Sequence, residues 1–203
     1  MKMLADDDSL DAIKEMINIG VGKAAGLLNE ITNSNIQLRV PEIRLILFRE
    51  LSEVSNKMLE DEVLSTVMLE FHGNFSGVTA LMFPPESASA LVKFLSGENH
   101  PSTEMDAVQV ETLKEVGNII INAVMGSISN VLLEHLSYSM PVYYEGRLSG
   151  IAATRQEMED DDYVILAHTQ FLIESMNIEG KLLLVLEVGS LERLIESIRR
   201  TNN

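Results

Sequence analysis

The sequence contains no cysteine among its 203 residues. Disulfide bonds and thiolate chemistry are therefore excluded. Basic residues are scarce as well: 15 Lys and Arg stand against 31 Asp and Glu, which gives a formal net charge of −16. So acidic a chain is poorly suited to bind nucleic acid or anionic membranes, because both present phosphate groups to a protein. We therefore expect neither as a partner.

Long hydrophobic runs are also missing. No apolar run in this sequence approaches the roughly 18 residues typical of a membrane span. The first residues, MKMLADDD, lack the hydrophobic segment of a secretory signal. These absences predict a cytoplasmic protein. Hydrophobic residues still make up 46% of the chain, which is ample material for a core.

The motifs of several enzyme classes are absent too. The four histidines have no metal-ligand spacing, so we expect no zinc site, and the glycine-rich loops that hold nucleotide phosphates are missing. The acidic segment 157–162 lacks the alternating ligands and central glycine of a Ca²⁺ loop, so a solvated turn is the better interpretation. In Gly73-Asn-Phe-Ser-Gly77 the serine is one position out of the G-x-S-x-G pattern, which favours a hairpin turn. We predict no metal and no cofactor of the protein's own.

What the sequence does contain is a pattern that occurs twice, 100 residues apart. The first copy is Asp11-x₃-Glu15-x₂-Asn18-x₂₂-Pro41, and the second is Glu111-x₃-Glu115-x₂-Asn118-x₂₂-Pro141. Segments 11–41 and 111–141 align without a gap. The identical positions are Lys14/Lys114, Glu15/Glu115, Asn18/Asn118, Ile19/Ile119, Gly26/Gly126 and Pro41/Pro141. The raw identity is weak, but its polar members fall at helical spacing.

Residues three or four apart project from the same side of an α-helix. Asp11, Glu15 and Asn18 therefore form one polar ridge, the first ridge. Glu111, Glu115 and Asn118 form its counterpart, the second ridge. Apolar positions with the same period predict the buried sides: Ile13, Met16, Ile17, Gly20, Ala24 and Leu27 in the first helix, and Leu113, Val116, Ile120, Val124 and Ile128 in the second. Asp8 or Ser9 is expected to cap the first helix, and Thr103 with Asp106 resembles a capping box for the second.

Two interpretations of the ridges compete. Glu and Asn are ordinary residues on the solvated face of a helix. Asn is less ordinary inside a helix, because its side chain competes with the backbone for hydrogen bonds, and here it occupies both matched positions. The two Asn residues could also be relics of a duplication, bonded into the core. The residues alone leave the functional and structural interpretations open.

The duplicated pattern resembles the signature Asp/Ser-x₃-Glu-x₂-Asn-x₂₂-Pro of the CheC/CheX/FliY phosphatases of chemotaxis. The resemblance covers nearly the whole chain, including both helices, the turn 73–77 and the strand 181–188. Two motifs in about 200 residues are most similar to CheC, whereas CheX carries one motif and FliY adds a further domain. Glu111 departs from the Asp or Ser of the family, so the first ridge is expected to be the stronger site.

The resemblance implies a function and a partner. Proteins of this family remove the phosphoryl group from the aspartyl phosphate of the response regulator CheY. The regulator supplies Mg²⁺ and a lysine, and the phosphatase places the attacking water. Asn18 and Asn118 would orient that water, Glu15 and Glu115 would pair with a cation on the regulator, and Asp11 and Glu111 would support them. The alternatives are a non-catalytic adaptor that binds the deamidase CheD, and a component near the flagellar switch.

The remaining pattern predicts the architecture. We expect helices at 9–33, 86–95, 104–134 and 190–200, and strands near 36–40, 43–49, 63–72, 78–83, 138–144, 147–155, 163–175 and 181–188, with a link at 98–102. Hairpin-length connections imply an antiparallel sheet that helices must cover. The expected fold is therefore α+β, with two long outer helices and a pseudo-twofold duplication. We predict a single domain spanning 1–203, made of repeats at about 9–97 and 104–200, and a monomer.

Overall fold

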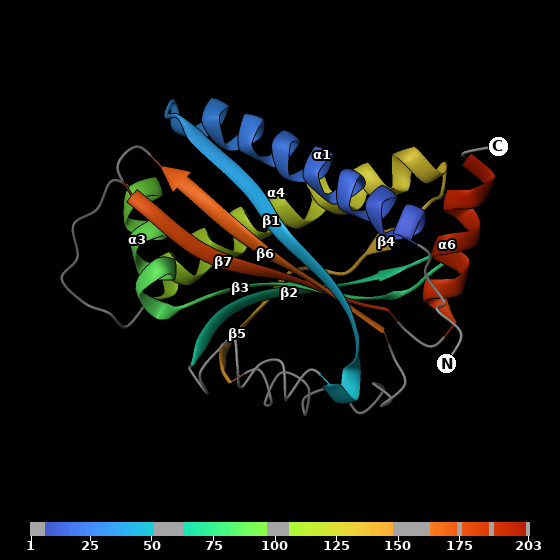
Figure 1. Ribbon diagram of the computed structural model, residues 1–203. Helices are drawn as coiled ribbons and strands as arrows, with labels where there is room; N and C mark the ends of the chain where they lie inside the picture. Colours follow the sequence, from blue (N-terminus) through green and yellow to red (C-terminus); the bar gives the residue numbers. More distant parts are fainter. Residues whose placement is uncertain are drawn as a thin grey trace.

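The computed structural model describes residues 7–50, 63–96, 106–147, 163–173, 176–186 and 189–201. Its helices are α1 (Asp7–Thr32), α3 (Pro85–Ser96), α4 (Ala107–Leu132) and α6 (Ser190–Thr201). Its strands are β1 (Ile36–Leu47), β2 (Leu64–His72), β3 (Gly77–Phe83), β4 (Ser137–Tyr138), β5 (Val142–Gly146), β6 (Tyr163–Ile173) and β7 (Met176–Leu186). The long helices α1 and α4 cover one face of the sheet, and α3 and α6 lie at its opposite ends (Figure 1).

The strands form one seven-stranded sheet in the order β1-β6-β7-β3-β2-β4, with β5 also paired to β2. Every pairing is antiparallel. The α+β fold with an antiparallel sheet and two long outer helices, as expected from the sequence, is confirmed.

The sheet interleaves strands from the two halves of the chain. β1 precedes α4 in the sequence but pairs with β6, which follows it, while β5 of the second half pairs with β2 of the first. The hairpins β2–β3 and β6–β7 meet in the middle of the sheet through the β3–β7 pairing. The pattern of pairing is therefore the same when the halves are exchanged. The boundaries of the two repeats stay an interpretation of the sequence.

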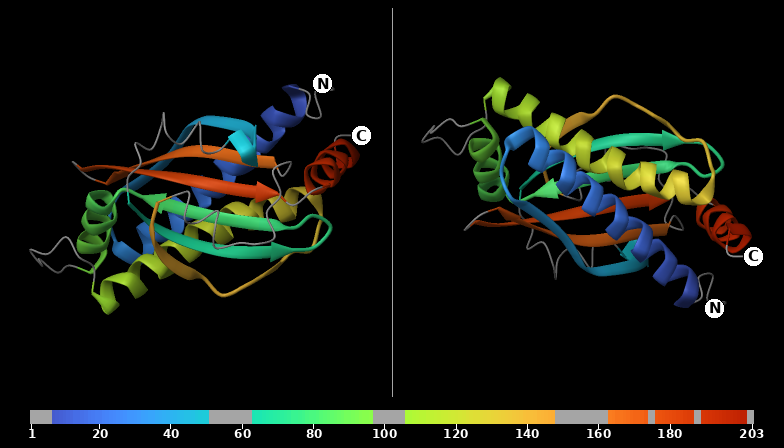
Figure 2. Two further views of the ribbon diagram at one scale, coloured as in Figure 1. Left: turned by 90° about the horizontal axis from the view of Figure 1, so that it is seen from below. Right: turned by 90° about the horizontal axis from the view of Figure 1, so that it is seen from above.

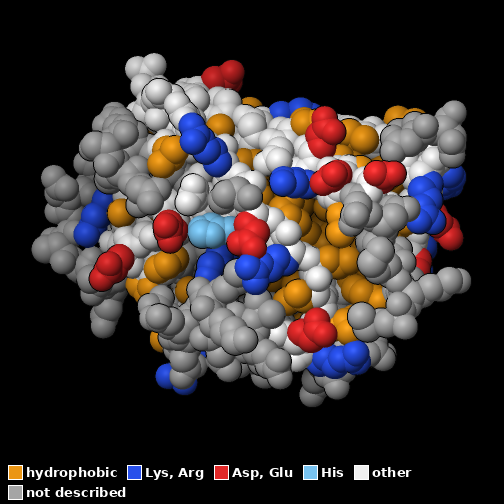
Figure 3. Space-filling model, viewed as in Figure 1, with side chains coloured by type: hydrophobic (Ala, Val, Ile, Leu, Met, Phe, Trp, Pro, Cys, Tyr) orange, Lys and Arg blue, Asp and Glu red, His pale blue; other side chains and the backbone are white. Residues whose placement is uncertain are grey.

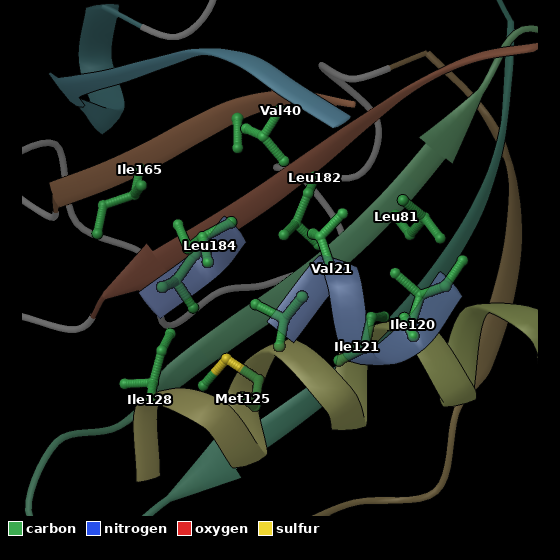
Figure 4. Close-up of a cluster of buried hydrophobic side chains, with 14 of the residues drawn as sticks. Val21, Val40, Leu81, Ile120, Ile121, Met125, Ile128, Ile165, Leu182 and Leu184 are labelled. Carbon is green, nitrogen blue, oxygen red and sulfur yellow. The ribbon is translucent and has the colours of Figure 1, made fainter. Parts of the chain in front are cut away.

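Apolar side chains fill both faces of the sheet. On the helix side, Val21 of α1 lies in a cluster to which α4 contributes Ile120, Ile121 and Met125, and to which the strands contribute Leu182 and Leu184 (Figure 4). The other face carries a second buried cluster: Leu64, Met68, Val78, Ala80, Met82, Val164, Leu166, Leu183 and Val185. Strand β3 is buried along its whole length, because side chains cover both faces of the sheet there. Its sequence is accordingly an almost continuous apolar run.

Helices α1 and α4 lie side by side across the sheet (Figure 2). They run antiparallel, since Gly20 meets Val124 while the region of Ala12 meets Leu132. A Cβ placed on Gly20 would lie 2.4 Å from the Cα of Val124, so this crossing requires glycine. Gly117 plays a similar part beneath α4, where an added Cβ would lie 2.7 Å from the side chain of Val67. The ridges are thereby held on two closely packed helices.

The helix ends differ in part from the expectation. Helix α1 begins at Asp7, so Asp8 and Ser9 lie within it and do not cap it. Asp106 does cap α4, but its capping box is completed by Gln109, three residues inside the helix. Thr103, the expected partner, lies outside the described residues. The box needs a side chain at the third helical position, which Gln109 occupies.

Both long helices end at a residue with positive φ. Asn33 (φ 51°) follows α1, and Leu133 (φ 55°) occupies the matching position after α4. Asn adopts this left-handed conformation readily, whereas a leucine adopts it at a cost. Leu133 is also 89% exposed, so neither propensity nor burial explains the choice of residue there.

Four details of the strand and helix assignment were wrong. The expected strand 181–188 begins five residues earlier, at Met176, as strand β7. The expected strands 36–40 and 43–49 form one strand, β1, with a register irregularity between Arg39 and Glu42 that absorbs Pro41. The expected strand 138–144 is divided into β4 and β5. Leu27, expected to be buried, is 47% exposed, because the helix buries Val21 and Leu28 instead. The turn at 73–77 is confirmed as the β2–β3 hairpin, while most of 147–155 and all of 98–102 lie outside the described residues.

Helix α4 is, by length and composition, apolar enough to cross a membrane. Half of its most apolar 18-residue window is buried inside the structure, against the sheet and α1. A core helix of this kind passes the same test of composition. The apolar character of α4 is therefore explained by its packing.

Candidate functional site

The first ridge lies on the solvent side of α1. Asp11, Glu15 and Asn18 are all exposed, while the neighbouring Ile13, Met16 and Ile17 are buried in the core. Within the described residues, none of the three ridge side chains makes a hydrogen bond or an ion pair. Their carboxylate and carboxamide groups are therefore available to a partner.

The second ridge lies on the matching face of α4, but Asn118 is half-buried there and two of the three ridge side chains are bonded to neighbours. The ammonium group of Lys114 donates to Glu111 over 2.8 Å. The side-chain amide of Asn122 donates to the Oδ1 atom of Asn118 over 2.7 Å. Glu115, between these two pairs, is exposed. The corresponding position to Asn122 on α1 is Gly22, so the two ridges differ in chemistry despite their matched sequence.

An apolar depression lies beside the first ridge, where α1, α4 and α6 meet. Its volume is about 240 Å³, and its lining comprises Ala12, Glu15, Met16, Ile19, Val131, Leu132 and Ile198. Ile19 and Val131 are about 40% exposed, so their apolar atoms are accessible to a partner. Glu15 is the charged member of this lining. The surface around the first ridge thus combines one carboxylate with an apolar recess.

A second depression of similar size lies on the opposite face of the sheet, over β1, β6 and β7. It is lined by Glu42, Arg44, Leu166, His168, Glu179 and Lys181. Glu42 and Arg44 form an ion pair there, and the Nε2 atom of His168 is buried without a hydrogen-bond partner. Positive and negative side chains are interspersed on the face seen in Figure 3, with apolar atoms between them. The mixture of signs gives this depression no net preference for an anion or a cation.

The chemistry available on the ridges is limited. In the described parts of the chain, no group of three or more His, Asp, Glu and Cys could hold a metal ion. A carboxylate and a carboxamide on an open helix also lack the water-excluding walls of an ordinary active site. Such a pair can bind a cation and orient a water molecule. Any reaction at the ridges must therefore be completed by groups that another molecule provides.

Sequence reasoning located the ridges but missed two of their neighbours. Asn122 lies one helical turn beyond Asn118 and could have been found by extending the second ridge by four residues. Ile198, which closes the depression beside Glu15, comes from a helix about 180 residues away in the chain. No local pattern could have placed it there.

Comparison with known proteins shows a similarity to chemotaxis proteins. The family model described as "Chemotaxis phosphatase CheX" matches residues 65–160, a region that contains the second ridge. The CheY-P phosphatase CheC of Bacillus subtilis (strain 168) is 24% identical over 138 residues. The aligned region is 66% of this chain and 65% of that protein, so the match spans slightly less than two thirds of the relative.

Solved structures with the same fold include FliY, FliM and CheX. FliY of Thermotoga maritima superposes with a TM-score of 0.79 at 18% identity, covering 98% of this chain and 100% of that one. The FliM middle domain of H. pylori gives 0.68 at 12% identity, with coverage of 95% and 99%. CheX in the CheX–CheY–BeF₃–Mg²⁺ complex of Borrelia burgdorferi gives 0.52 at 14% identity, with coverage of 86% and 99%.

The fold is therefore the CheC-like fold, a curled antiparallel sheet beneath two long helices that FliY, CheX and the FliM middle domain share. Together with the sequence matches, it makes the chain similar to the CheC/CheX/FliY proteins, in part of its sequence and across its fold.

Proposed function

We propose that this protein is a phosphatase that hydrolyses the aspartyl phosphate of a CheY-type response regulator in chemotaxis signalling. One observation carries the proposal: both outer helices present an exposed Glu three residues before an Asn, at matched positions, in a chain that is similar to a CheY-P phosphatase. A protein that served only as a structural or adaptor module would have no physical need for two matched carboxamides.

The proposed mechanism divides the work between the two proteins. Phosphoryl transfer needs an in-line nucleophile and stabilisation of a loose, metaphosphate-like transition state. The regulator would supply Mg²⁺ and a lysine that neutralise the phosphoryl charge. Asn18 or Asn118 would hold the attacking water in line, which lowers the barrier by removing its orientational freedom. A carboxamide suits this task because it orients water without bringing another negative charge to the phosphoryl oxygens.

The glutamates would fix the docked position. Glu15 and Glu115 lie one turn before the carboxamides and would each pair with a cation on the regulator. At the first ridge, the depression beside Glu15 would take up an apolar side chain next to that cation. Docking of the regulator would then bring its acyl phosphate over Asn18.

The decisive experiment is the decay of phosphate on a purified, phosphorylated CheY-type regulator with and without this protein. We expect decay to accelerate in proportion to the protein concentration. The matched control is the double variant Asn18→Ala/Asn118→Ala at the same concentration. Equal decay in all three samples would reject the phosphatase activity.

A role in protein assembly is the alternative, and the likeness to FliM favours it. The FliM middle domain has this fold, and one related structure is a FliG–FliM complex. An adaptor that binds the deamidase CheD, as CheC-type proteins do, would also be a protein that binds a partner without catalysis. In this alternative the protein binds its partner with equal affinity whether or not the ridge asparagines are present. Binding without accelerated decay would therefore select it.

A further inference from the structure

We infer that Asn122 is a positioning residue of the second ridge, and that it holds the carboxamide of Asn118 in one orientation before the regulator docks. The inference rests on the proposed phosphatase function and identifies a residue outside the duplicated motif. Asn122 itself would not touch the phosphoryl group.

The geometry is that of a side-chain pair one helical turn apart. Asn118 and Asn122 are related by i, i+4 on α4, so their side chains are neighbours on its surface. The Nδ2 atom of Asn122 lies 2.7 Å from the Oδ1 atom of Asn118. This hydrogen bond couples the two carboxamides, so Asn118 cannot exchange its oxygen and nitrogen ends unless the bond breaks or Asn122 rotates as well. An unbonded, exposed carboxamide would exchange these ends by rotation.

The bond leaves Asn118 able to work. A carboxamide has two N–H donors on its nitrogen and two lone pairs on its oxygen. Asn122 uses one lone pair, so the second lone pair and both donors remain. Asn118 can thus still accept a hydrogen bond from the attacking water and donate to a neighbouring oxygen. Because no required group is blocked, the effect of Asn122 is to restrain the carboxamide, and restraint before binding favours catalysis.

The first ridge has no residue that could make the equivalent hydrogen bond to Asn18. Gly22 occupies the position that matches Asn122, and it is exposed. A Cβ built on Gly22 meets nothing within 4 Å, so packing does not exclude a larger residue there. The duplicated motif is therefore restrained on α4 and unrestrained on α1. The sequence, through Glu111, favours the first ridge as the stronger site, whereas this hydrogen bond favours the second.

The test uses variants that retain a single ridge asparagine. Asn18→Ala leaves only the second ridge, and Asn122→Ala is then added to it. We expect the maximal rate of regulator dephosphorylation to fall roughly 2- to 10-fold, the range expected for losing one hydrogen bond, with no change in the regulator concentration at half-maximal rate. Asn122→Gln keeps an amide donor and is expected to retain more of the rate than Asn122→Ala. An unchanged or increased rate in the Asn122→Ala variant would overturn the inference.

The reciprocal change is made on the other helix. Asn118→Ala leaves only the first ridge, and Gly22→Asn then adds the missing carboxamide. We expect the maximal rate to rise above that of a Gly22→Ala control, which replaces the glycine and favours the helix at least as strongly but supplies no hydrogen bond. Equal rates for Gly22→Asn and Gly22→Ala would count against the inference.

Different results would refute the phosphatase function and the role of Asn122. If the unmutated protein does not accelerate dephosphorylation, the proposed function is wrong. If it does so, but the Asn18→Ala protein has no activity, then Asn122 assists no working site and the inference is wrong while the function stands.

Discussion

At the scale of single residues, the ridges differ from an ordinary solvated helix face in one respect. Each has an Asn where Lys, Gln or Ala would serve a surface helix better, because Asn has poor helix propensity. Asn18 and Asn118 do not make up for this cost by bonding into the core, since Asn18 is exposed and Asn118 bonds only to another surface Asn in the described structure. The structure thus removes the core-relic interpretation that the sequence left open.

The first prediction concerns both carboxamides together. We expect Asn18→Ala/Asn118→Ala to abolish stimulated dephosphorylation while the protein stays folded, because alanine raises helix propensity at both positions. Regulator-phosphate decay measures the activity, and circular dichroism with urea unfolding measures the fold. A folded double variant that clears phosphate at the parental rate would refute the assignment of Asn18 and Asn118.

The second prediction concerns the charge on the glutamates. Glu15→Gln and Glu115→Gln keep the shape of the side chain but remove its charge. We expect each to weaken binding of the phosphorylated regulator by roughly 1–3 kcal/mol if the ion pair is desolvated in the complex. The dependence of affinity on ionic strength should also become flatter. Titrations at two salt concentrations check both effects, and Glu30→Gln, an exposed glutamate of α1 outside the ridge, is the control. Unchanged affinity and salt slope would assign Glu15 and Glu115 to the solvated surface.

How much of the site the sequence predicts depends on how local its signals are. The ridges follow from spacing within one helix, so the exposure of Asp11, Glu15 and Glu115 could be read directly. The depression beside Glu15 could not, because Val131 and Ile198 reach it from other elements. The bond between Asn118 and Asn122 could have been predicted only in part. The two residues are four apart on one helix, but nothing in the sequence indicated that Asn122 belongs to the site.

At the scale of elements, glycine has two opposite effects in the long helices. Gly20 and Gly117 permit close packing, because a Cβ at either position would collide with a neighbour. Gly26 and Gly126 have nothing within 4 Å of the position of a Cβ. At these two positions glycine only lowers helix propensity. The first pair therefore determines how α1, α4 and the sheet pack, while the second pair does not.

The third prediction compares two glycines of α1. Gly20→Ala should destabilise the protein by roughly 1–3 kcal/mol, because its methyl group would collide with the backbone of α4. Gly26→Ala should stabilise it by about 0.5–1 kcal/mol, through reduced freedom of the unfolded chain. Urea unfolding of both variants checks the signs. Similar effects at the two positions would show that the helices do not pack as described.

The elements themselves were largely predictable, and the pairing of strands was not. The helical period identified the buried side of α4 at all five expected positions, because one face of that helix packs on the sheet. For α1 the helical period wrongly placed Leu27 on the buried side, whereas the structure turns this residue toward solvent. The pairing of β1 with β6 depends on contacts across the whole chain, and no local pattern specifies such a partner.

At the scale of the whole molecule, one carboxylate joins three distant segments. Glu134, just after α4, accepts hydrogen bonds from Asn74 in the β2–β3 turn and from Ser197 and Arg200 of α6. The distances are 2.9 Å, 2.9 Å and 3.1 Å respectively. The Glu134 side chain is only 19% exposed, so its bonds are partly shielded from water. It fixes α6, which closes the depression beside the first ridge.

The fourth prediction tests this junction. Glu134→Ala should lower the free energy of unfolding by roughly 1–3 kcal/mol, because partly buried donors lose their acceptor. Arg200→Ala should cost less than about 1 kcal/mol, since the Arg200 side chain is 69% exposed and its ion pair is screened. Thermal and urea unfolding compare the two variants. A larger loss for Arg200→Ala than for Glu134→Ala would reverse this assignment.

The fifth prediction follows from the interleaved sheet. If the chain is divided between Ser96 and Asp106, neither piece retains all of its strand partners, because β1 needs β6 and β5 needs β2. We expect each piece alone to lack a cooperative unfolding transition and the mixture to regain one. Circular dichroism of the separate and mixed pieces is the measurement. Cooperative folding of residues 1–97 alone would show that the first half does not depend on the second.

The same pairing bears on how the protein is made. β1 ends at Leu47 and its partner β6 begins at Tyr163, so 163 − 47 = 116 positions of chain must be added before β1 can be paired. At about 5–20 residues per second, this takes roughly 6–23 s on the ribosome. A bare strand left waiting that long is a template for aggregation. Pro41, which has no backbone N–H, and the charged Arg39, Glu42 and Arg44 interrupt that template. We expect these residues to keep the nascent chain soluble until its second half is made.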